Sequence, residues 1–245
     1  MKRFDFIHIC LLLLSVILFF GCLYFRFERN RLLEHTINEK QGYHPKEVSF
    51  MQLSVEKSWA NCLRQLNIHR DIVFFGNSIT RNGEFQHYFP HHSICNLGHG
   101  GDDLDGMLRR VGMIVSLSPE KIFLMAGIND LADNIPLTLF ETKYRNIVTA
   151  ITDSLPESKL YIQSILPVSK EKQRIFGSNQ KIDSINTIIY SISEEFGLQF
   201  IDLYSLYIVD GELPRQYSDD GLHVNRDSYN IWKEYLDPYI NEELY

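Results

Sequence analysis

The sequence lacks several features that would point to particular classes of protein. It has no sustained run of basic residues, and its formal net charge is −7. Because phosphate binding needs clustered Lys and Arg, we expect no nucleic-acid partner. Internal repeats and low-complexity stretches are also missing. With 245 residues, 44% of them hydrophobic, the chain is long enough for one α/β domain with a packed core and an appendage.

Cysteine is scarce, with four residues in the whole chain. Cys10 and Cys22 lie in an apolar N-terminal segment, which leaves Cys62 and Cys95. The spacing of these two does not suggest a zinc site. Cys95 falls in a segment that we expect to form a buried strand, so packing is its predicted role.

Three histidines, His87, His91 and His92, cluster in a Pro-containing loop and raise the question of a metal. Glu84 is the only carboxylate close to them in the sequence, and no predicted strand or helix fixes the loop. We therefore expect a solvated loop there, and we predict no metal and no cofactor for the protein.

One long hydrophobic run is present, over residues 7–25, and it carries no formal charge. About 19 residues at ~1.5 Å each nearly span the core of a bilayer. A buried core helix is the alternative, but such a helix should show a polar face. We predict a membrane anchor over residues 1–25, a polar stalk over 26–46 and the main domain over 47–245.

Cleavage of the hydrophobic run is a further alternative. Lys2 and Arg3 precede the run, as in a signal sequence, and Phe-Phe-Gly-Cys ending at Cys22 loosely resembles a lipoprotein cleavage site. Bulky Phe19 and Phe20 fit such a site poorly, so an uncleaved signal anchor is favoured. Basic residues flank the run on both sides, so the positive-inside rule does not decide its orientation.

Short apolar segments alternate with amphipathic ones along the rest of the chain. The predicted strands are 72–75, 93–97, 121–125, 159–165 and 199–201. The predicted helices are 47–66, 104–117, 137–154, 181–196 and 226–241. This alternation indicates an α/β domain with a parallel sheet of about five strands and helices on both faces. Ligands of such sheets gather beyond the carboxyl ends of the strands.

Polar residues follow three of the predicted strands. Ser78 comes directly after the first strand and exposes a hydroxyl at the sheet edge, although it would also serve as a helix N-cap. The glycines of 98–101 follow the second strand and allow backbone amides to approach an anion closely. Asn129 follows the third strand, and its carboxamide either donates to a developing oxyanion or caps a helix.

The segment Asp220-Gly221-Leu222-His223 lies near the end of the chain. An aspartate three residues before a histidine on one turn can hold one ring nitrogen while the other nitrogen faces a serine. Taken alone, the segment is also an ordinary Asp-Gly turn. Together with Ser78 earlier in the chain, the segment favours a serine hydrolase.

Four sequence blocks occur in the order typical of one family. They are Gly-Asn-Ser-Ile-Thr, Asn-x-Gly-x-x-Gly-Asp, Gly-x-Asn-Asp and Asp-Gly-Leu-His, and they fall between about Ile72 and Leu236. The chain thereby resembles the SGNH hydrolases, also called the GDSL esterase/lipase family. The resemblance implies a flavodoxin-like, three-layer α/β/α sandwich and ester hydrolysis without a metal.

The resemblance also implies a role for each matching residue. Ser78 would be the nucleophile, His223 the general base and Asp220 the residue that orients it. The oxyanion hole would comprise the backbone N–H groups of Ser78 and Gly101 and the side chain of Asn129. Family habit further implies an extracytoplasmic catalytic domain.

Two details bear on these roles. The aspartate that usually precedes the nucleophile in the family is Asn77 here, which keeps the size and hydrogen-bonding capacity but removes a charge. Asp219 competes for the orienting role, but the spacing to His223 favours Asp220. We expect activity to survive the Asn77 replacement, with a different dependence on pH.

The expected substrate is a small-molecule or glycan ester. The loops 167–180 and 209–218 should rim the pocket with mixed polar and aromatic residues, and His99, Arg174 and Tyr217 are candidate substrate contacts. Residues 162–167 resemble the acetylhydrolase branch of the family, which favours an O-acetyl esterase on a carbohydrate. A lysophospholipase or thioesterase is the rival enzyme, and a catalytically silent glycan-binding module the rival from another class.

Overall fold

The computed structural model of the chain describes residues 50–244, and the side chains of residues 58–244. The predicted anchor and stalk, residues 1–46, lie outside the described residues. Within residues 50–244, no helix combines the length and the apolar character needed to cross a bilayer.

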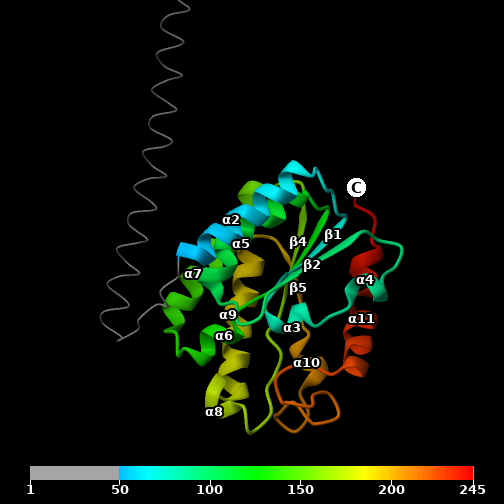
Figure 1. The fold of residues 1–245 in the computed structure, drawn as a ribbon. Coiled ribbons are helices and arrows are strands. Elements are labelled where there is room, and N and C mark those ends of the chain that lie inside the picture. Colours follow the sequence, from blue (N-terminus) through cyan, green and yellow to red (C-terminus); the bar gives the residue numbers. More distant parts are fainter. Residues whose placement is uncertain (1–49, 245) are drawn as a thin grey trace, which may run out of the picture. The chain divides into compact units, whose positions relative to one another are not determined.

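The core of the domain is a parallel sheet of five strands in the order β2-β1-β3-β4-β5 (Figure 1). The strands are β1 (Ile72–Gly76), β2 (Ile94–Gly98), β3 (Lys121–Met125), β4 (Lys159–Gln163) and β5 (Gln199–Ile201). This 2-1-3-4-5 order is that of flavodoxin-like, doubly wound sheets. The predicted fold class is confirmed for the described domain.

The register of the sheet brings the carboxyl ends of its strands to one edge. Gly76, the last residue of β1, pairs with Gly98 on β2 and with Met125 on β3. β1 and β3 are buried along their whole length, whereas β2 is an edge strand and is buried only in part. Cys95 lies on β2 as predicted, but it is half-buried because β2 is an edge strand.

Five longer helices surround the sheet. They are α2 (Phe50–Gln65), α5 (Leu104–Leu117), α7 (Leu137–Ser154), α9 (Asn179–Glu195) and α11 (Arg226–Asn241). Helices α5, α7 and α9 lie on one side of the sheet and α11 on the other, which gives three layers (Figure 1). Each predicted helix agrees with these bounds within three residues, because the apolar side chains recur at helical spacing.

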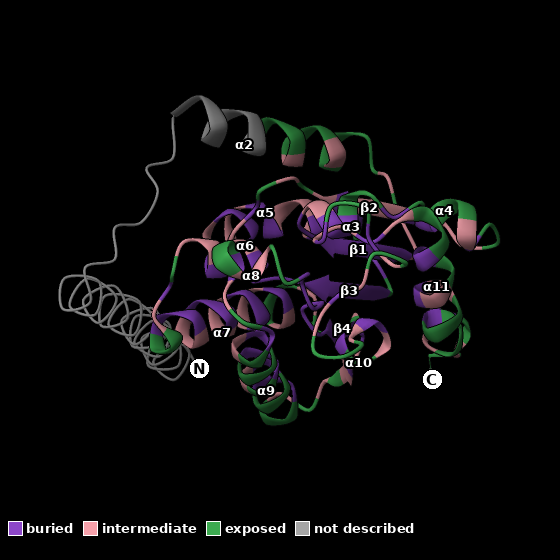
Figure 2. Cartoon of the chain, turned by 90° about the horizontal axis from the view of Figure 1, so that it is seen from below, coloured by how far each residue is buried: buried purple, intermediate pink, exposed green. Residues whose placement is uncertain are grey.

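Helix α2 packs differently from the expected amphipathic first helix. It contacts α5, yet Trp59 is 57% exposed and Leu66 61% exposed. The outer position of α2 is visible in Figure 2, where its described end is largely green. Apolar spacing therefore located this helix, but it did not predict that Trp59 and Leu66, at the end whose side chains the structure describes, would be exposed.

Five helices of a single turn were not predicted. They are α3 (Ser78–Arg81), α4 (Phe85–Tyr88), α6 (Ile128–Ala132), α8 (Gln173–Phe176) and α10 (Tyr204–Tyr207). Helices α3 and α6 begin just beyond the ends of β1 and β3. They carry the two polar blocks around Ser78 and Asn129.

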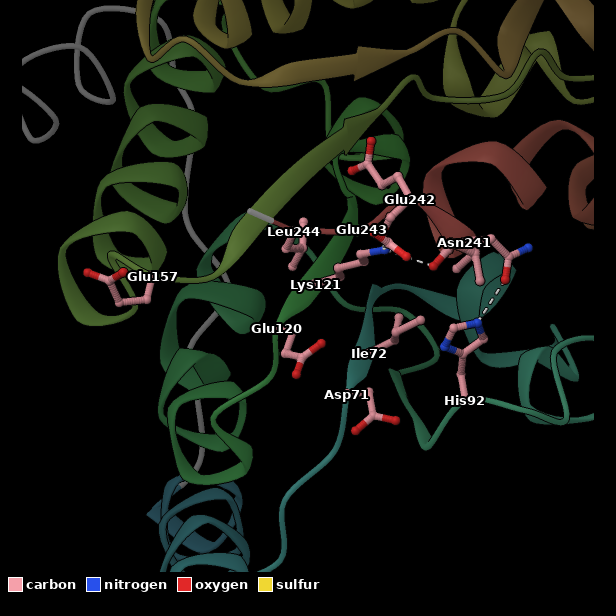
Figure 3. A pocket seen from close by; sticks show the side chains of 11 residues that line it. Asp71, Ile72, His92, Glu120, Lys121, Glu157, Asn241, Glu242, Glu243 and Leu244 are labelled. Atoms are coloured by element: carbon pink, nitrogen blue, oxygen red, sulfur yellow. Dashed lines mark hydrogen bonds between the residues drawn. The ribbon is translucent and has the colours of Figure 1, made fainter.

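The opposite edge of the sheet, at the amino ends of the strands, is closed by the end of α11. The buried ammonium of Lys121 donates to the carbonyls of Tyr239, Ile240 and Glu242 at 3.2, 2.8 and 2.7 Å. A hollow of about 640 Å³ lies beside these contacts (Figure 3). Lys121 thus joins the last helix to the first residue of the central strand.

Candidate active site

The position of Ser78 follows from a tight turn between β1 and α3. Asn77 caps α3 by accepting the N–H of Ile79 at 2.9 Å, so the helix begins at Ser78. A β-carbon at Gly76 would lie 2.1 Å from Thr80 Oγ1 and 2.8 Å from the carbonyl of Met125. Glycine at that position therefore lets α3 fold back against the end of the sheet.

The predicted Asp-Gly-Leu-His segment forms a turn that holds His223. One oxygen of Asp220 accepts the backbone N–H groups of Leu222 and His223 at 2.9 and 2.8 Å. The other oxygen lies 2.7 Å from His223 Nδ1. Gly221 has a φ of +79°, and a β-carbon there would lie 2.2 Å from Ser169 Oγ, so the turn requires glycine.

Ser78, His223 and Asp220 form one chain of hydrogen bonds. His223 Nε2 lies 2.8 Å from Ser78 Oγ, and Nδ1 faces Asp220. With Nδ1–H donated to the carboxylate, Nε2 carries the lone pair and can accept the serine proton. The spacing argument for Asp220 over Asp219 agrees with this contact.

The charge of Asp220 is held by its partners. Desolvation raises the pKa of this carboxyl, but the hydrogen bonds from the His223 ring, from its backbone N–H and from Leu222 together hold the pKa below its usual range. Asp220 is therefore ionised at neutral pH.

The two remaining oxyanion candidates lie in the connections that follow β2 and β3. Gly101 has a φ of +76° and is exposed, with open space where a β-carbon would be. Asn129 Nδ2 donates to the backbone carbonyl of Asp102 at 2.7 Å, which fixes the orientation of its carboxamide. An amide nitrogen has two N–H groups, so one stays available for a ligand.

A buried ion pair between Arg110 and Asp102 holds the segment that contains Gly101. Arg110 on α5 donates its Nε to Asp102 at 2.9 Å and its Nη2 to the same oxygen. Nη1 donates to the carbonyl of Leu97 at 3.0 Å, and Nη2 also reaches that of Gly76 at 3.4 Å. One guanidinium thus connects the ends of β1 and β2 with the residue that follows Gly101.

Burial also acts on Asp130, the neighbour of Asn129. Desolvation, reinforced by the nearby charge of Asp103, raises the pKa of Asp130 to about 8, although the N–H of Leu104 opposes the shift. The carboxyl receives that N–H at 3.1 and 3.3 Å on its two oxygens. Asp130 therefore ties the first residue of α5 to α6.

The predicted substrate contacts have different surroundings. The His99 side chain is 61% exposed, and its Nδ1 lies 4.0 Å from an oxygen of Asp102. Arg174 is exposed on α8. The ring of Tyr217 packs edge-on against Tyr207 of α10 at 5.6 Å between centroids, so the structure gives this residue a packing contact with a helix.

Sequence reasoning missed the role of Asp102 and Arg110. Asp102 belongs to the Asn-x-Gly-x-x-Gly-Asp block, which was a signal that it matters. Arg110 had no such signal, because two of its acceptors, on Leu97 and Gly76, are backbone carbonyls that any residue type would supply.

The three histidines of the cluster His87, His91 and His92 lie outside the candidate triad. His92 Nε2 lies 2.9 Å from Asn241 Oδ1 at the end of α11, and the His87 ring packs against Tyr88. His91 is exposed. The expectation that no helix fixes these histidines was wrong for His87, which lies in α4. His92 links the connection between β1 and β2 to the last helix.

Comparison with solved structures gives strong matches to one fold. A GDSL-like lipase from Bacteroides thetaiotaomicron matches with a TM-score of 0.67 at 24% identity, over 78% of this chain and 100% of that one. A lipase/acylhydrolase from Enterococcus faecalis matches with 0.61 at 18% identity, over 70% and 95%. An acetyl xylan esterase matches with 0.60 at 16% identity, over 69% and 98%.

Comparison with curated proteins gives no significant match. The sequence profile of the GDSL-like lipase/acylhydrolase family matches residues 74–231, which is most of the described domain and includes all four polar blocks. The chain therefore belongs to the GDSL-like lipase/acylhydrolase family and is an ester hydrolase.

Proposed function

We propose that the protein hydrolyses esters by a Ser-His-Asp triad through an acyl-enzyme. The observation that carries the proposal is the unbroken chain from Ser78 Oγ through both ring nitrogens of His223 to Asp220, with links of 2.8 and 2.7 Å. Ser78 is the nucleophile, His223 the general base, and Asp220 orients the ring and stabilises its protonated form.

The cycle has two halves that share one oxyanion hole. Ser78 Oγ attacks the ester carbonyl while His223 Nε2 takes its proton, and the intermediate collapses as His223 returns that proton to the departing alcohol. Water then attacks the acyl-enzyme by the same route and releases the acid. The N–H groups of Ser78 and Gly101 and the free N–H of Asn129 stabilise the oxyanion in both halves.

The proposed substrate is a short-chain ester, above all an O-acetyl group on a carbohydrate. The loops around the triad offer exposed polar side chains such as His99 and Arg174. The similarity of fold to an acetyl xylan esterase and the acetylhydrolase-like segment 162–167 favour the same substrate class. A silent glycan-binding module would have no need to keep the hydrogen-bonded triad.

Acyl-chain preference tests the substrate class. We expect the enzyme to prefer 4-nitrophenyl acetate over the decanoate by kcat/KM, and to release acetate from acetylated xylo-oligosaccharides. Ser78→Ala should abolish both activities and serves as the control for non-enzymatic hydrolysis. A preference for the long chain would instead support the lysophospholipase or thioesterase alternative.

The location of the enzyme is also a proposal. The uncharged run over residues 7–25 supports a membrane anchor, with the catalytic domain on the extracytoplasmic side. Cells expressing the full chain should retain it in the membrane fraction after carbonate extraction. External protease should digest the domain in intact spheroplasts, whereas protection until lysis would reverse the proposed orientation.

A further inference from the structure

We infer that Arg81 and Lys172 flank the triad as a binding site for a negatively charged group on the substrate, a carboxylate or a phosphate close to the scissile ester. The inference rests on the proposed function and narrows its substrate class. It comes from two cationic side chains that each contact one of the loops forming the site.

Arg81 lies on the oxyanion side. It is the last residue of α3, three residues after Ser78, and it is exposed. A β-carbon at Gly100 would lie 2.4 Å from Arg81 Nη1, so the guanidinium rests on the backbone next to Gly101. The guanidinium of Arg81 fits there because Gly100 has no side chain.

The guanidinium of Arg81 has unused donors. Its Nε makes a long hydrogen bond of 3.3 Å to the side chain of Asn82. Within the part of the chain that the structure describes, Arg81 has no ion pair, and its two Nη groups have no hydrogen bond. Such a planar fork binds carboxylate or phosphate oxygens in pairs.

Lys172 contacts the turn that carries His223. It immediately precedes α8, and its Cγ would lie 3.3 Å from a β-carbon at Gly221, inside the Asp220–His223 turn. Its side chain is half-buried, and its ammonium makes no ion pair within residues 58–244. The aliphatic stem therefore packs on the catalytic turn while the charge is left for a ligand.

The carboxylates nearby are mostly engaged elsewhere. Asp220 is bonded to His223, and Asp102 to Arg110. Glu171 interacts with its own backbone and with Ser169, and more weakly with Arg215 and Lys170. Asp219 is exposed beside the turn.

Arg81 and Lys172 are thus two cations beside the site that make no ion pair among the described residues, in a chain whose net charge is −7. Cations at a site mouth in an otherwise acidic protein attract an anionic substrate and orient it. An ester that bears a carboxylate or phosphate would place this group between Arg81 and Lys172 while its carbonyl meets Ser78.

A matched pair of acetates tests the inference. 4-Acetoxybenzoate and 4-acetoxybenzamide have the same size and the same acetyl group, but only the first is charged. The readout is the ratio of their kcat/KM values for acetate release, compared between the full-length enzyme and its variants, so that intrinsic reactivity cancels.

We expect Arg81→Gln and Lys172→Gln each to lower this ratio by about three- to fivefold, as for an exposed charge pair. Added salt should lower the ratio of the unchanged enzyme. Arg64→Gln is the matched control, because it removes an exposed arginine from the end of α2 and should keep the ratio.

The outcomes separate this inference from the proposed function. A ratio that neither Arg81→Gln nor Lys172→Gln changes, while acetate is still released, would overturn the anionic site alone. Release of acetate from neither compound would overturn the short-chain esterase and the anionic site together.

Discussion

At the scale of single residues, Asn77 and Thr80 show how closely the turn around the nucleophile is packed. Asn77 is 1% exposed, and one of its side-chain atoms, Oδ1, caps α3. Its Nδ2, like Thr80 Oγ1, is buried without a hydrogen-bond partner among the described residues. Loss of the Asn77 side chain should therefore reduce stability more than loss of the Thr80 hydroxyl.

Asn77→Ala removes the cap, and we expect it to lower the free energy of unfolding by about 1 kcal/mol and to reduce kcat through the freed N–H of Ile79. Thr80→Val is the control, because it deletes a hydroxyl that makes no bond, and it should change stability little. Urea unfolding and ester hydrolysis measure both effects. Equal losses in the two variants would contradict the assignment of the cap.

Asp130 makes the stability of the protein depend on pH. Its folded-state pKa of about 8 lies above the ordinary value of 3.8, so between these values the native state holds a proton that the unfolded state has lost. Stability contributed by this proton is complete below about pH 4 and is lost as pH rises towards 8, at up to about 1.4 kcal/mol per pH unit.

Asp130→Asn keeps an acceptor for the N–H of Leu104 and removes the titration. We expect the variant to gain stability relative to the unchanged protein as pH rises from 5 to 8.5, measured by urea unfolding at each pH. Parallel pH profiles of the two proteins would contradict the raised pKa. The pKa of the Asp130 carboxyl also depends on the charges of Asp103, Asp105 and Lys143, which are the same in both proteins.

At the scale of elements, α5 holds the oxyanion side of the site through Arg110. The arginine holds the Asp102 carboxylate, and the Asp102 carbonyl receives the Asn129 amide. A shift in the position of α5 would therefore displace both Gly101 and Asn129. Arg110 acts here as a positioning residue, since it contacts neither nucleophile nor base.

Arg110→Met leaves Asp102 buried without its partner, and we expect a loss of about 3–5 kcal/mol in stability and a lower kcat with little change in KM. The double variant Asp102→Leu/Arg110→Met replaces the pair by apolar groups and should recover much of the stability. We expect it to keep the low kcat. Full recovery of kcat in the double variant would show that the pair serves stability alone.

The sequence predicted long elements well and local geometry poorly. Helix α5 was predicted at its observed bounds because Leu104, Met107, Val111 and Ile114 recur at helical spacing. The one-turn helices α3 and α6 are too short for any periodicity. The pairing of Arg110 depends on backbone carbonyls at Leu97 and Gly76, which only the folded sheet brings together.

At the scale of the whole molecule, a contact that stabilises the fold and the residues of the proposed chemistry lie at opposite edges of the sheet. Lys121 joins β3 to the end of α11 at the amino edge of the sheet (Figure 3). Burial lowers the pKa of its ammonium, while Glu242 opposes the shift. The same strand leads at its other end to Asn129. Three of the four blocks could be assigned to one edge because parallel strands end there. The fourth, Asp220–His223, meets them through the contact of His223 with Ser78.

Lys121→Met should therefore cost stability without changing the site. We expect a loss of about 1–3 kcal/mol, because three carbonyls lose their donor, and an unchanged kcat/KM of the folded enzyme. Lys159→Met is the control, because that ammonium pairs with Glu242 on the exposed surface and its loss should cost less than about 1 kcal/mol. A changed kcat/KM in Lys121→Met would show coupling between the two edges.

Covalent labelling by a fluorophosphonate tests the central claim most directly. The reagent forms a phosphorus–oxygen bond with an activated serine and releases fluoride. We expect one label, located by mass spectrometry on the peptide that contains Ser78, no label in Ser78→Ala, and much slower labelling in His223→Ala. Labelling that persists in Ser78→Ala would contradict the assignment of the nucleophile.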